Sequence, residues 1–210
     1  MANQTNKKSD KFFYEYKAKL ILIKCFNEMY SQNLILDDKP DLQDITNSIG
    51  IEVTRAFRTN KIAEQQSLWK NHKILRVNKK SKNEYKKNHI SYSCVKDKCL
   101  VMMFYPSTKY LIDSFIVKLN KLNDDLYIKF TYYDLFIFSH ELKEFDMKDM
   151  PPLLDTMIML QANSNFQYRI VYILDIDIIY CYNLLTKTFS TIRIDSNILD
   201  AINNQAKKEK

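Results

Sequence analysis

The chain has 210 residues, of which 46% are hydrophobic and 27% charged, so it has an ordinary globular composition and enough length for a sizeable core. Gly50 is its only glycine, whereas average usage predicts about 15. A Walker A loop, a dinucleotide-binding fingerprint and a kinase glycine-rich loop each need two or more glycines, so all three are excluded.

The positive charge is concentrated in the first half of the chain. The net charge is +7, and residues 1–110 carry 21 Lys and Arg against 11 Asp and Glu, whereas residues 111–210 carry 11 against 14. This asymmetry predicts a surface that faces a polyanion, of which nucleic acid is the commonest. A solvated lysine surface with no partner is the alternative interpretation.

The cysteines and histidines show no metal-binding spacing. The four cysteines form no CxxC pair and the three histidines stand apart from them, so we expect no structural zinc site. With no signal peptide, we expect reduced thiols in a cytoplasmic protein. The longest apolar runs fall far below the ~18 residues that a membrane helix needs, which predicts a soluble protein with no membrane partner.

The first third of the chain predicts a helix, a strand hairpin and a second helix. Residues 1–10 are polar and are expected to form a disordered tail. In residues 11–30, apolar side chains such as Phe12, Tyr16 and Leu20 recur at steps of three and four, which is typical of an amphipathic helix. Short strands are predicted at 34–36 and 49–54, and a helix at 58–72.

The rest of the chain alternates between helices and strands. Residues 70–98 hold ten basic side chains against two acidic ones, so 73–98 is predicted to be a basic, mobile loop. Helices are predicted at 108–123, 151–160 and 196–205, and strands within 126–139, 169–182 and 187–194. With no repeat and no linker, the pattern predicts one α/β domain over residues 1–210.

Two acidic residues near the predicted hairpin form the most specific pattern. Asp41 follows Pro40 at the end of a turn, and Glu52 lies eleven residues later on the polar face of a strand. If the hairpin returns Glu52 to Asp41, the two carboxylates form a hard-oxygen site suited to Mg²⁺ or Mn²⁺. A separation beyond about 8 Å, or a salt bridge that consumes either acid, would remove the catalytic proposal. Each acid alone is also ordinary turn or surface chemistry.

This pattern resembles the PD-(D/E)xK nuclease superfamily. The resemblance implies a restriction-endonuclease-like core, with a mixed central β-sheet flanked by helices, and metal-dependent hydrolysis of phosphodiester bonds in DNA. Asp41 would match the aspartate of the PD element and Glu52 the second acid, while Glu15 would match an acid on the N-terminal helix. These three side chains would hold Mg²⁺ or Mn²⁺. Glu15 is also explained by a helical ion pair with Lys11 or Lys19.

The sequence departs from the family at one position. Thr54 occupies the place of the motif lysine, and a hydroxyl can position a water but supplies no positive charge. Some members of the superfamily place this lysine on the following helix, where Lys61 is the nearest basic residue in register. The predicted catalytic residues are therefore Asp41, Glu52, Thr54 and Lys61.

Six lysines are candidates for contact with nucleic acid. Clustered basic side chains release counterions on binding a phosphate backbone, and two of the six lie at i and i+3 on the helix 108–123. Lysines on the polar side of an amphipathic helix are also ordinary. The candidates are Lys70, Lys73, Lys79, Lys80, Lys118 and Lys121.

Asp175 and Asp177 form a second acidic pair. They alternate within the predicted strand 169–182 and would lie on one face of it. A second metal site there is one interpretation. Exposure to solvent or pairing with Lys or Arg is the other.

Catalysis is one of several functions that the sequence allows. The missing motif lysine favours a nuclease-like fold that has lost activity and serves as a nucleic-acid-binding or protein-interaction module. The sequence leaves open whether the substrate is DNA or RNA. It also leaves open whether the protein forms the homodimer that cleavage of two strands would require.

Overall fold

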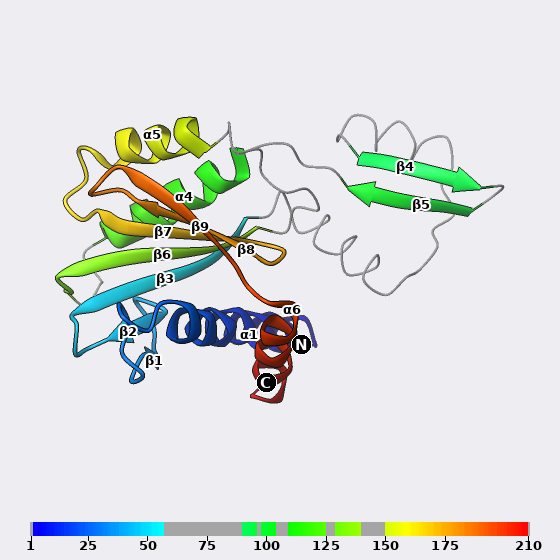
Figure 1. Cartoon of the computed structure of the whole chain (residues 1–210), viewed down its shortest axis with the longest axis horizontal. Helices are drawn as coiled ribbons and strands as arrows, with labels where there is room; N and C mark the ends of the chain where they lie inside the picture. Colours follow the sequence, from blue (N-terminus) through cyan, green and yellow to red (C-terminus); the bar gives the residue numbers. More distant parts are fainter. Residues whose placement is uncertain are drawn as a thin grey trace.

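The computed structural model describes residues 2–56, 90–95, 98–103, 109–124, 129–139 and 150–209. Within these residues, seven strands form one mixed sheet in the order β1-β2-β3-β6-β7-β8-β9 (Figure 1). Neighbours β3, β6 and β7 run parallel, and the other pairs run antiparallel. The strands are β1 (Ile35–Leu36), β2 (Leu42–Asp44), β3 (Ile49–Ala56), β6 (Tyr132–Ser139), β7 (Tyr168–Asp175), β8 (Ile178–Asn183) and β9 (Thr188–Arg193).

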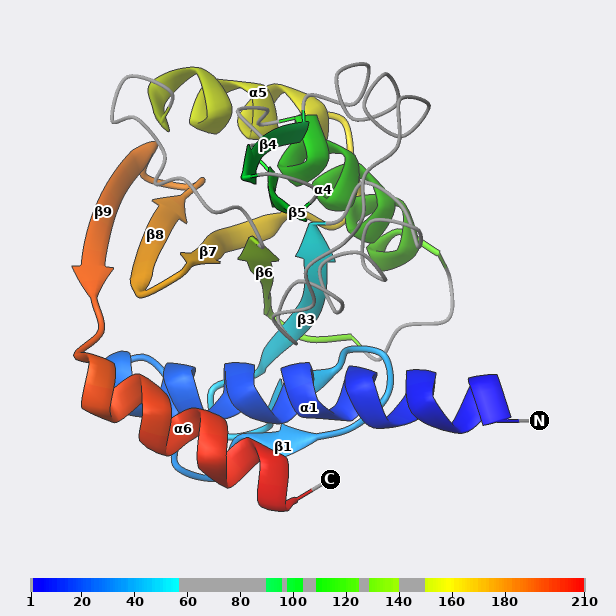
Figure 2. The same ribbon diagram turned by 90° about the vertical axis from the view of Figure 1, so that its right-hand side faces the viewer.

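Helices cover both faces of this sheet. Helices α1 (Ala2–Cys25) and α6 (Ser196–Lys208) lie on one face, and α4 (Lys109–Leu122) and α5 (Met150–Gln161) lie on the other (Figures 1 and 2). Helix α4 lies between β3 and β6 in the sequence, as parallel neighbours require a crossover connection. The α/β class with a mixed sheet is therefore confirmed. None of the described helices has the length and apolar content needed to cross a membrane.

Two apolar cores sandwich the sheet. The core beneath α1 and α6 contains Ile21, Leu22 and Phe136, and the core beneath α4 and α5 contains Phe115 and Leu135. Residues 135–138 of β6 therefore alternate between two buried faces. This explains why they form a continuous apolar run instead of an alternating one.

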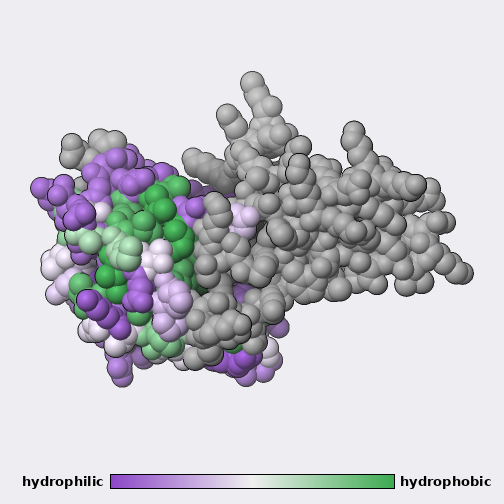
Figure 3. Space-filling view, turned by 90° about the horizontal axis from the view of Figure 1, so that it is seen from above, coloured by the Kyte–Doolittle hydropathy of each residue, from purple (hydrophilic) through white to green (hydrophobic). Residues whose placement is uncertain are grey.

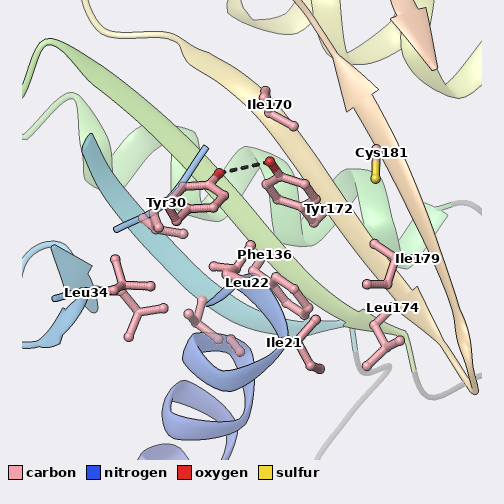
Figure 4. Close-up of a cluster of buried hydrophobic side chains, with 14 of the residues drawn as sticks. Ile21, Leu22, Tyr30, Leu34, Phe136, Ile170, Tyr172, Leu174, Ile179 and Cys181 are labelled. Carbon is pink, nitrogen blue, oxygen red and sulfur yellow. Dashed lines mark hydrogen bonds between the residues drawn. The ribbon is translucent and has the colours of Figure 1, made fainter. Parts of the chain in front are cut away.

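The first core also contains a buried acid. Asp134 is fully buried, and Arg169 donates to both of its oxygens at 3.1 and 2.6 Å. The Ile170 N–H donates to it at 3.0 Å, and the Tyr30 hydroxyl donates at 2.6 Å. The Tyr30 hydroxyl also lies 2.9 Å from that of Tyr172, as Figure 4 shows. These donors replace the hydration that the carboxylate loses on burial.

Several predicted boundaries differ from the structure. Helix α1 begins at Ala2, whereas residues 1–10 were expected to form a disordered tail. The predicted strand 169–182 is a hairpin instead, because β7 and β8 turn at residues 176 and 177. The backbone there has Ile176 at φ 53°, a left-handed conformation in which a strand cannot continue.

That turn separates the second acidic pair. Asp175 ends β7 in a fully buried position, whereas Asp177 lies in the turn and accepts a hydrogen bond from Arg193 at 2.7 Å. The two acids do not share one face of one strand, so the expected pair is wrong. Asp177 instead has the arginine partner that was the alternative interpretation.

The predicted basic loop 73–98 is described only at its end. Strand β4 (Ile90–Val95) pairs antiparallel with β5 (Lys98–Met103) in a two-stranded sheet of its own. Residues 90–95 therefore form a strand, and the mobility expected of this segment stays a prediction. Residues 73–89 and the predicted helix 58–72 lie outside the described residues.

Gly50 is held where a side chain does not fit. A Cβ atom at this position in β3 would lie 2.7 Å from Pro40 Cγ, 3.0 Å from Phe130 Cδ2 and 3.2 Å from Tyr133 Cδ1. The first distance is too short for carbon atoms in contact, and the proline ring has little freedom to move away. The glycine therefore lets Pro40, which precedes Asp41, pack against β3.

We expect Gly50→Ala to lower the free energy of unfolding by about 1–3 kcal/mol because of this overpacking. Urea denaturation of the variant measures the loss. Thr191→Ala, at an exposed position of β9, is the control and should change stability by less than about 0.5 kcal/mol. Equal stability of Gly50→Ala and the wild type would show that Pro40 is not a rigid neighbour.

The surface over α5 is unusually apolar. Figure 3 shows hydrophobic residues there, bordered by hydrophilic ones. Met159 is 76% exposed and Leu160 is 38% exposed, although α5 also buries Leu153 and Met157. The helix is therefore apolar around much of its circumference, unlike an ordinary amphipathic helix.

Candidate functional site

The register of the β2–β3 hairpin brings Asp41 opposite Glu52. Leu42 pairs with Ile51, so the residue before Leu42 faces the residue after Ile51 across the two strands. The Val53 N–H donates to Asp41 Oδ2 at 2.8 Å and fixes the aspartate against β3. Asp41 is 3% exposed and Glu52 is 2% exposed. The structure therefore brings together the two acids whose meeting the sequence predicted.

The turn of this hairpin is stabilised by another aspartate. Asp44 accepts hydrogen bonds from the backbone N–H of Ser31 at 2.7 Å and of Asn47 at 3.1 Å. Its pKa is below the ordinary value because these donors outweigh the effect of burial. Asp44 thus ties the hairpin turn to the segment after α1 and keeps the arms of the hairpin in register.

Lys118 of α4 lies between the two acids. Its Nζ donates to Asp41 Oδ2 at 2.9 Å and also to Glu52 Oε2. The lysine is 9% exposed, so this ammonium group is largely removed from water. Burial lowers the pKa of Lys118, but the charges of the two carboxylates raise it further and keep it above its ordinary value. The lysine is therefore a cation at neutral pH.

The same contacts keep Asp41 ionised. Burial raises the pKa of Asp41, but the Lys118 charge and the Val53 N–H outweigh it and lower the pKa to about 2. Asp41 therefore offers a carboxylate over the whole physiological range. A permanently charged oxygen pair is what binding of a cation requires.

Lys11 and Glu15 of α1 complete the cluster. Lys11 Nζ lies 3.2 Å from Glu15 Oε1 and 3.2 Å from Asp41 Oδ1. The helical ion pair of these two residues was one of the interpretations of Glu15, but the acid is not on the surface, since it is 8% exposed. Burial and the nearby Asp41 charge raise the pKa of Glu15 to about 7. Glu15 therefore changes charge near neutral pH.

A pocket adjoins these acids. Its volume is about 270 Å³, and residues from α1, β3 and α4 form its walls. Arg55 lies on the α1 side of β3, with its guanidinium 4.5 Å from the centre of the Tyr14 ring. Thr54, at the position of the family's lysine, lies on the wall of the pocket. The lining residues are Lys11, Tyr14, Glu15, Val53, Thr54, Arg55 and Lys118.

The predicted nucleic-acid contacts are only partly described. Lys121 is exposed on α4, as a residue that contacts a polyanion would be, whereas Lys118 is buried against two acids and is not part of that surface. The two lysines therefore lie in different surroundings, and their contact with nucleic acid stays a prediction. The predicted catalytic Lys61 and the predicted contacts Lys70, Lys73, Lys79 and Lys80 lie outside the described residues.

The sequence contained a signal for Lys118. The buried residues Leu111, Phe115 and Leu122 recur along one side of α4, and Lys118 falls within this stripe at position i+3 from Phe115. A lysine in an apolar stripe is costly to bury unless it has a partner, so it indicates an acid on the facing element. Lys11 and Arg55 also belong to the pocket and were not predicted.

The described cysteines offer no activated nucleophile. Cys25 and Cys181 are free thiols. Burial raises the pKa of both, that of Cys181 to about 12, so neither is a thiolate at neutral pH. The carboxylate and lysine cluster is therefore the strongest candidate site within the described part of the chain.

The described residues contain no group of three or more His, Cys, Asp or Glu side chains arranged to hold a metal ion. Comparison of the chain with protein-family models, with curated proteins and with solved structures finds no match. The functional interpretation therefore depends on the geometry of the cluster and on the motif in the sequence.

Proposed function

We propose that the protein is a divalent-metal-dependent nuclease that hydrolyses phosphodiester bonds of DNA on a restriction-endonuclease-like core. One observation carries the proposal. Carboxylates from the two arms of one hairpin, Asp41 and Glu52, reach the same buried cation beside a pocket. The order of a helix, a strand hairpin, a further helix and a parallel strand also agrees with this core.

Asp41 and Glu52 offer Mg²⁺ or Mn²⁺ a pair of carboxylates, not a group of three or more ligands. The Lys118 ammonium group acts as a stand-in cation, because it shows that oxygens of both acids converge on one positive charge. Carboxylate oxygens are the ligands that these hard metals prefer. Asp41 and Glu52 would hold the ion, with Glu15 beside Asp41 as the third proposed ligand. A bound ion would polarise the phosphodiester and lower the pKa of the attacking water.

Lys118 supplies the positive charge that Thr54 lacks. The salt bridges of Lys118 with Asp41 and Glu52 are the finding that was expected to remove a catalytic role, because a salt bridge neutralises a metal ligand. Here the partner is a lysine, which is the residue type that the PD-(D/E)xK motif contains besides its two acids. We therefore assign the role of the motif lysine to Lys118 in place of Lys61. Its ammonium group would stabilise negative charge that develops on the phosphate.

The choice of a nucleic acid as substrate rests on charge. Residues 1–110 carry 21 basic against 11 acidic side chains, and Lys11 and Arg55 add cations to the walls of the pocket. A polyanion is attracted to such a surface even though the acids lie at its centre. DNA in preference to RNA is what the resemblance to the nuclease superfamily implies.

A second candidate function is binding without catalysis. The contact of Lys118 with both acids favours it, because an internal ammonium group satisfies the carboxylates with no metal present. In this case the protein would be a nuclease-like module that binds nucleic acid or another protein. Its affinity for DNA would then be independent of divalent ions.

A cleavage and binding assay distinguishes the two functions. Labelled single-stranded and double-stranded DNA, and RNA, are incubated with the protein in Mg²⁺, Mn²⁺ or EDTA. The nuclease proposal predicts products with either metal, none with EDTA, and a rate at least about a hundredfold lower for Asp41→Asn. DNA binding that is the same with EDTA and in Asp41→Asn, without products, favours the binding module. No DNA affinity at low salt favours a protein partner.

A further inference from the structure

The protein's own lysine fills the cation position of the candidate metal site. Lys118 Nζ contacts Asp41 Oδ2 at 2.9 Å and also contacts Glu52 Oε2. The other oxygen of the aspartate, Asp41 Oδ1, lies 3.2 Å from Lys11 Nζ. A divalent ion bound to Asp41 and Glu52 together would therefore have to occupy the same space as the Lys118 ammonium group.

We propose that Lys118 and a divalent metal ion compete for Asp41 and Glu52, so that metal binding displaces the lysine ammonium group from both acids. The inference rests on the metal site of the proposed function. It adds that Lys118 leaves the two acids when the metal ion binds. Until a metal ion binds, the ammonium charge of Lys118 offsets the electrostatic repulsion between the two carboxylates. Once displaced, its charge is free to meet the phosphate of a substrate.

Lys118 is a stronger competitor than Lys11. Lys118 contacts both acids and is 9% exposed, so its charge is screened little by water. The side chain of Lys11 is 56% exposed, and its contacts with Asp38, Glu15 and Asp41 are all at 3.2 Å or longer. The metal therefore gains much more from removal of Lys118 than from removal of Lys11.

The pocket gives the displaced ammonium group a place to move to. Lys118 is itself part of the wall of the 270 Å³ pocket, which Glu15 also lines. The cluster of Glu15, Asp41 and Glu52 with Lys11 and Lys118 has a formal charge of −1 when all five groups are ionised. A bound divalent ion would reverse this sign, and repulsion between the two cations then favours movement of the lysine into the pocket.

Titration with Mn²⁺ alone tests the competition. Binding is measured by calorimetry and by electron paramagnetic resonance on the full chain, for the wild type, Lys118→Met and Lys11→Met. We expect the Kd for Mn²⁺ to fall by at least about tenfold in Lys118→Met and by no more than about threefold in Lys11→Met. An unchanged or higher Kd in Lys118→Met overturns the inference, and so does an equal gain in both variants.

Nuclear magnetic resonance of the wild type keeps the test independent of how the variants fold. With ¹⁵N-labelled lysine, the buried Lys118 ammonium group should give its own signal, which shifts or disappears as Mg²⁺ is added. A signal that stays in place while Mg²⁺ binds overturns the competition and leaves the proposed function standing. If neither the wild type nor Lys118→Met binds Mn²⁺ or Mg²⁺, the competition and the proposed metal-dependent function are both overturned.

Discussion

The proposed metal-dependent nuclease activity is expected to fall by at least about a hundredfold in Lys118→Met at saturating Mg²⁺. The reason is electrostatic. Thr54 supplies no positive charge at the motif position, and the Lys118 ammonium group is the cation that contacts both Asp41 and Glu52. Loss of this charge leaves the negative charge that develops on the phosphate without its stabilising partner. The rate is measured under single-turnover conditions, so that substrate binding and product release do not limit it.

Lys121→Met is the matched control. Lys121 lies one turn further along α4 and is exposed, so its removal takes the same charge from the same helix without touching the acids. We expect its cleavage rate to change by less than about threefold, with a somewhat weaker dependence of DNA affinity on salt. A Lys118→Met protein that cleaves as fast as Lys121→Met would contradict the role assigned to Lys118. The Mn²⁺ titration separates this effect from metal loss, since the same substitution should tighten metal binding.

Arg169→Met should lower the free energy of unfolding by about 3–5 kcal/mol. Arg169 donates to both oxygens of Asp134, and that carboxylate is fully buried. Without the guanidinium group, the charge of Asp134 would remain in the core with only neutral donors from Tyr30 and Ile170. Urea denaturation at neutral pH measures the loss.

Arg193→Met controls for the removal of an arginine from the sheet. Arg193 pairs with Asp177 at 2.7 Å, but its side chain is 60% exposed and that of Asp177 is 27% exposed. A pair so close to water contributes less than about 1 kcal/mol. If Arg169→Met lowered the free energy of unfolding no more than Arg193→Met does, the hydrogen bonds to Asp134 would not stabilise the first core as proposed. Arg169→Met/Asp134→Leu should regain part of the stability, because it removes the uncompensated charge as well.

The meeting of Asp41 and Glu52 was predictable because it is local. Eleven residues separate them, a turn signal lies between, and alternation in 49–54 shows which side of β3 is polar. The register then follows from the hairpin. The position of Lys118 is not local, because it is 66 residues from Glu52 and reaches it through the crossover of α4 from β3 to β6. Only the lysine's place in an apolar stripe pointed to a buried partner.

Helical periodicity alone did not identify the side of α1 that packs against the sheet. The large apolar residues of this helix predicted a face through Phe12, Tyr16 and Leu20, yet Phe12 is 36% exposed. The fully buried positions are those of Ala18, Ile21 and Leu22, on the side of the helix that also holds the buried Glu15. Small and branched side chains let the helix approach the sheet closely, and aromatic side chains lie at the edges of the contact. Glu15 therefore reaches the site from a side of α1 that the large apolar side chains of this helix did not predict to be buried.

The β7–β8 turn was missed for a related reason. The segment 169–182 is almost continuously apolar, and it contains neither glycine nor proline at the turn. The left-handed Ile176 takes the conformation that glycine or asparagine usually adopts. With one glycine in the whole chain, the usual signals of turns are scarce, and tertiary packing decides where this strand ends.

Anomalous diffraction from crystals soaked in Mn²⁺ shows whether a metal ion binds to Asp41 and Glu52. We expect a manganese peak within bonding distance of oxygens of both acids, with Lys118 Nζ moved away from them. The same soak of Asp41→Asn should show a weaker peak or none. Crystals in which no manganese binds and Lys118 remains between the two acids, at concentrations of Mn²⁺ well above those that support nucleases, would contradict a metal-dependent site.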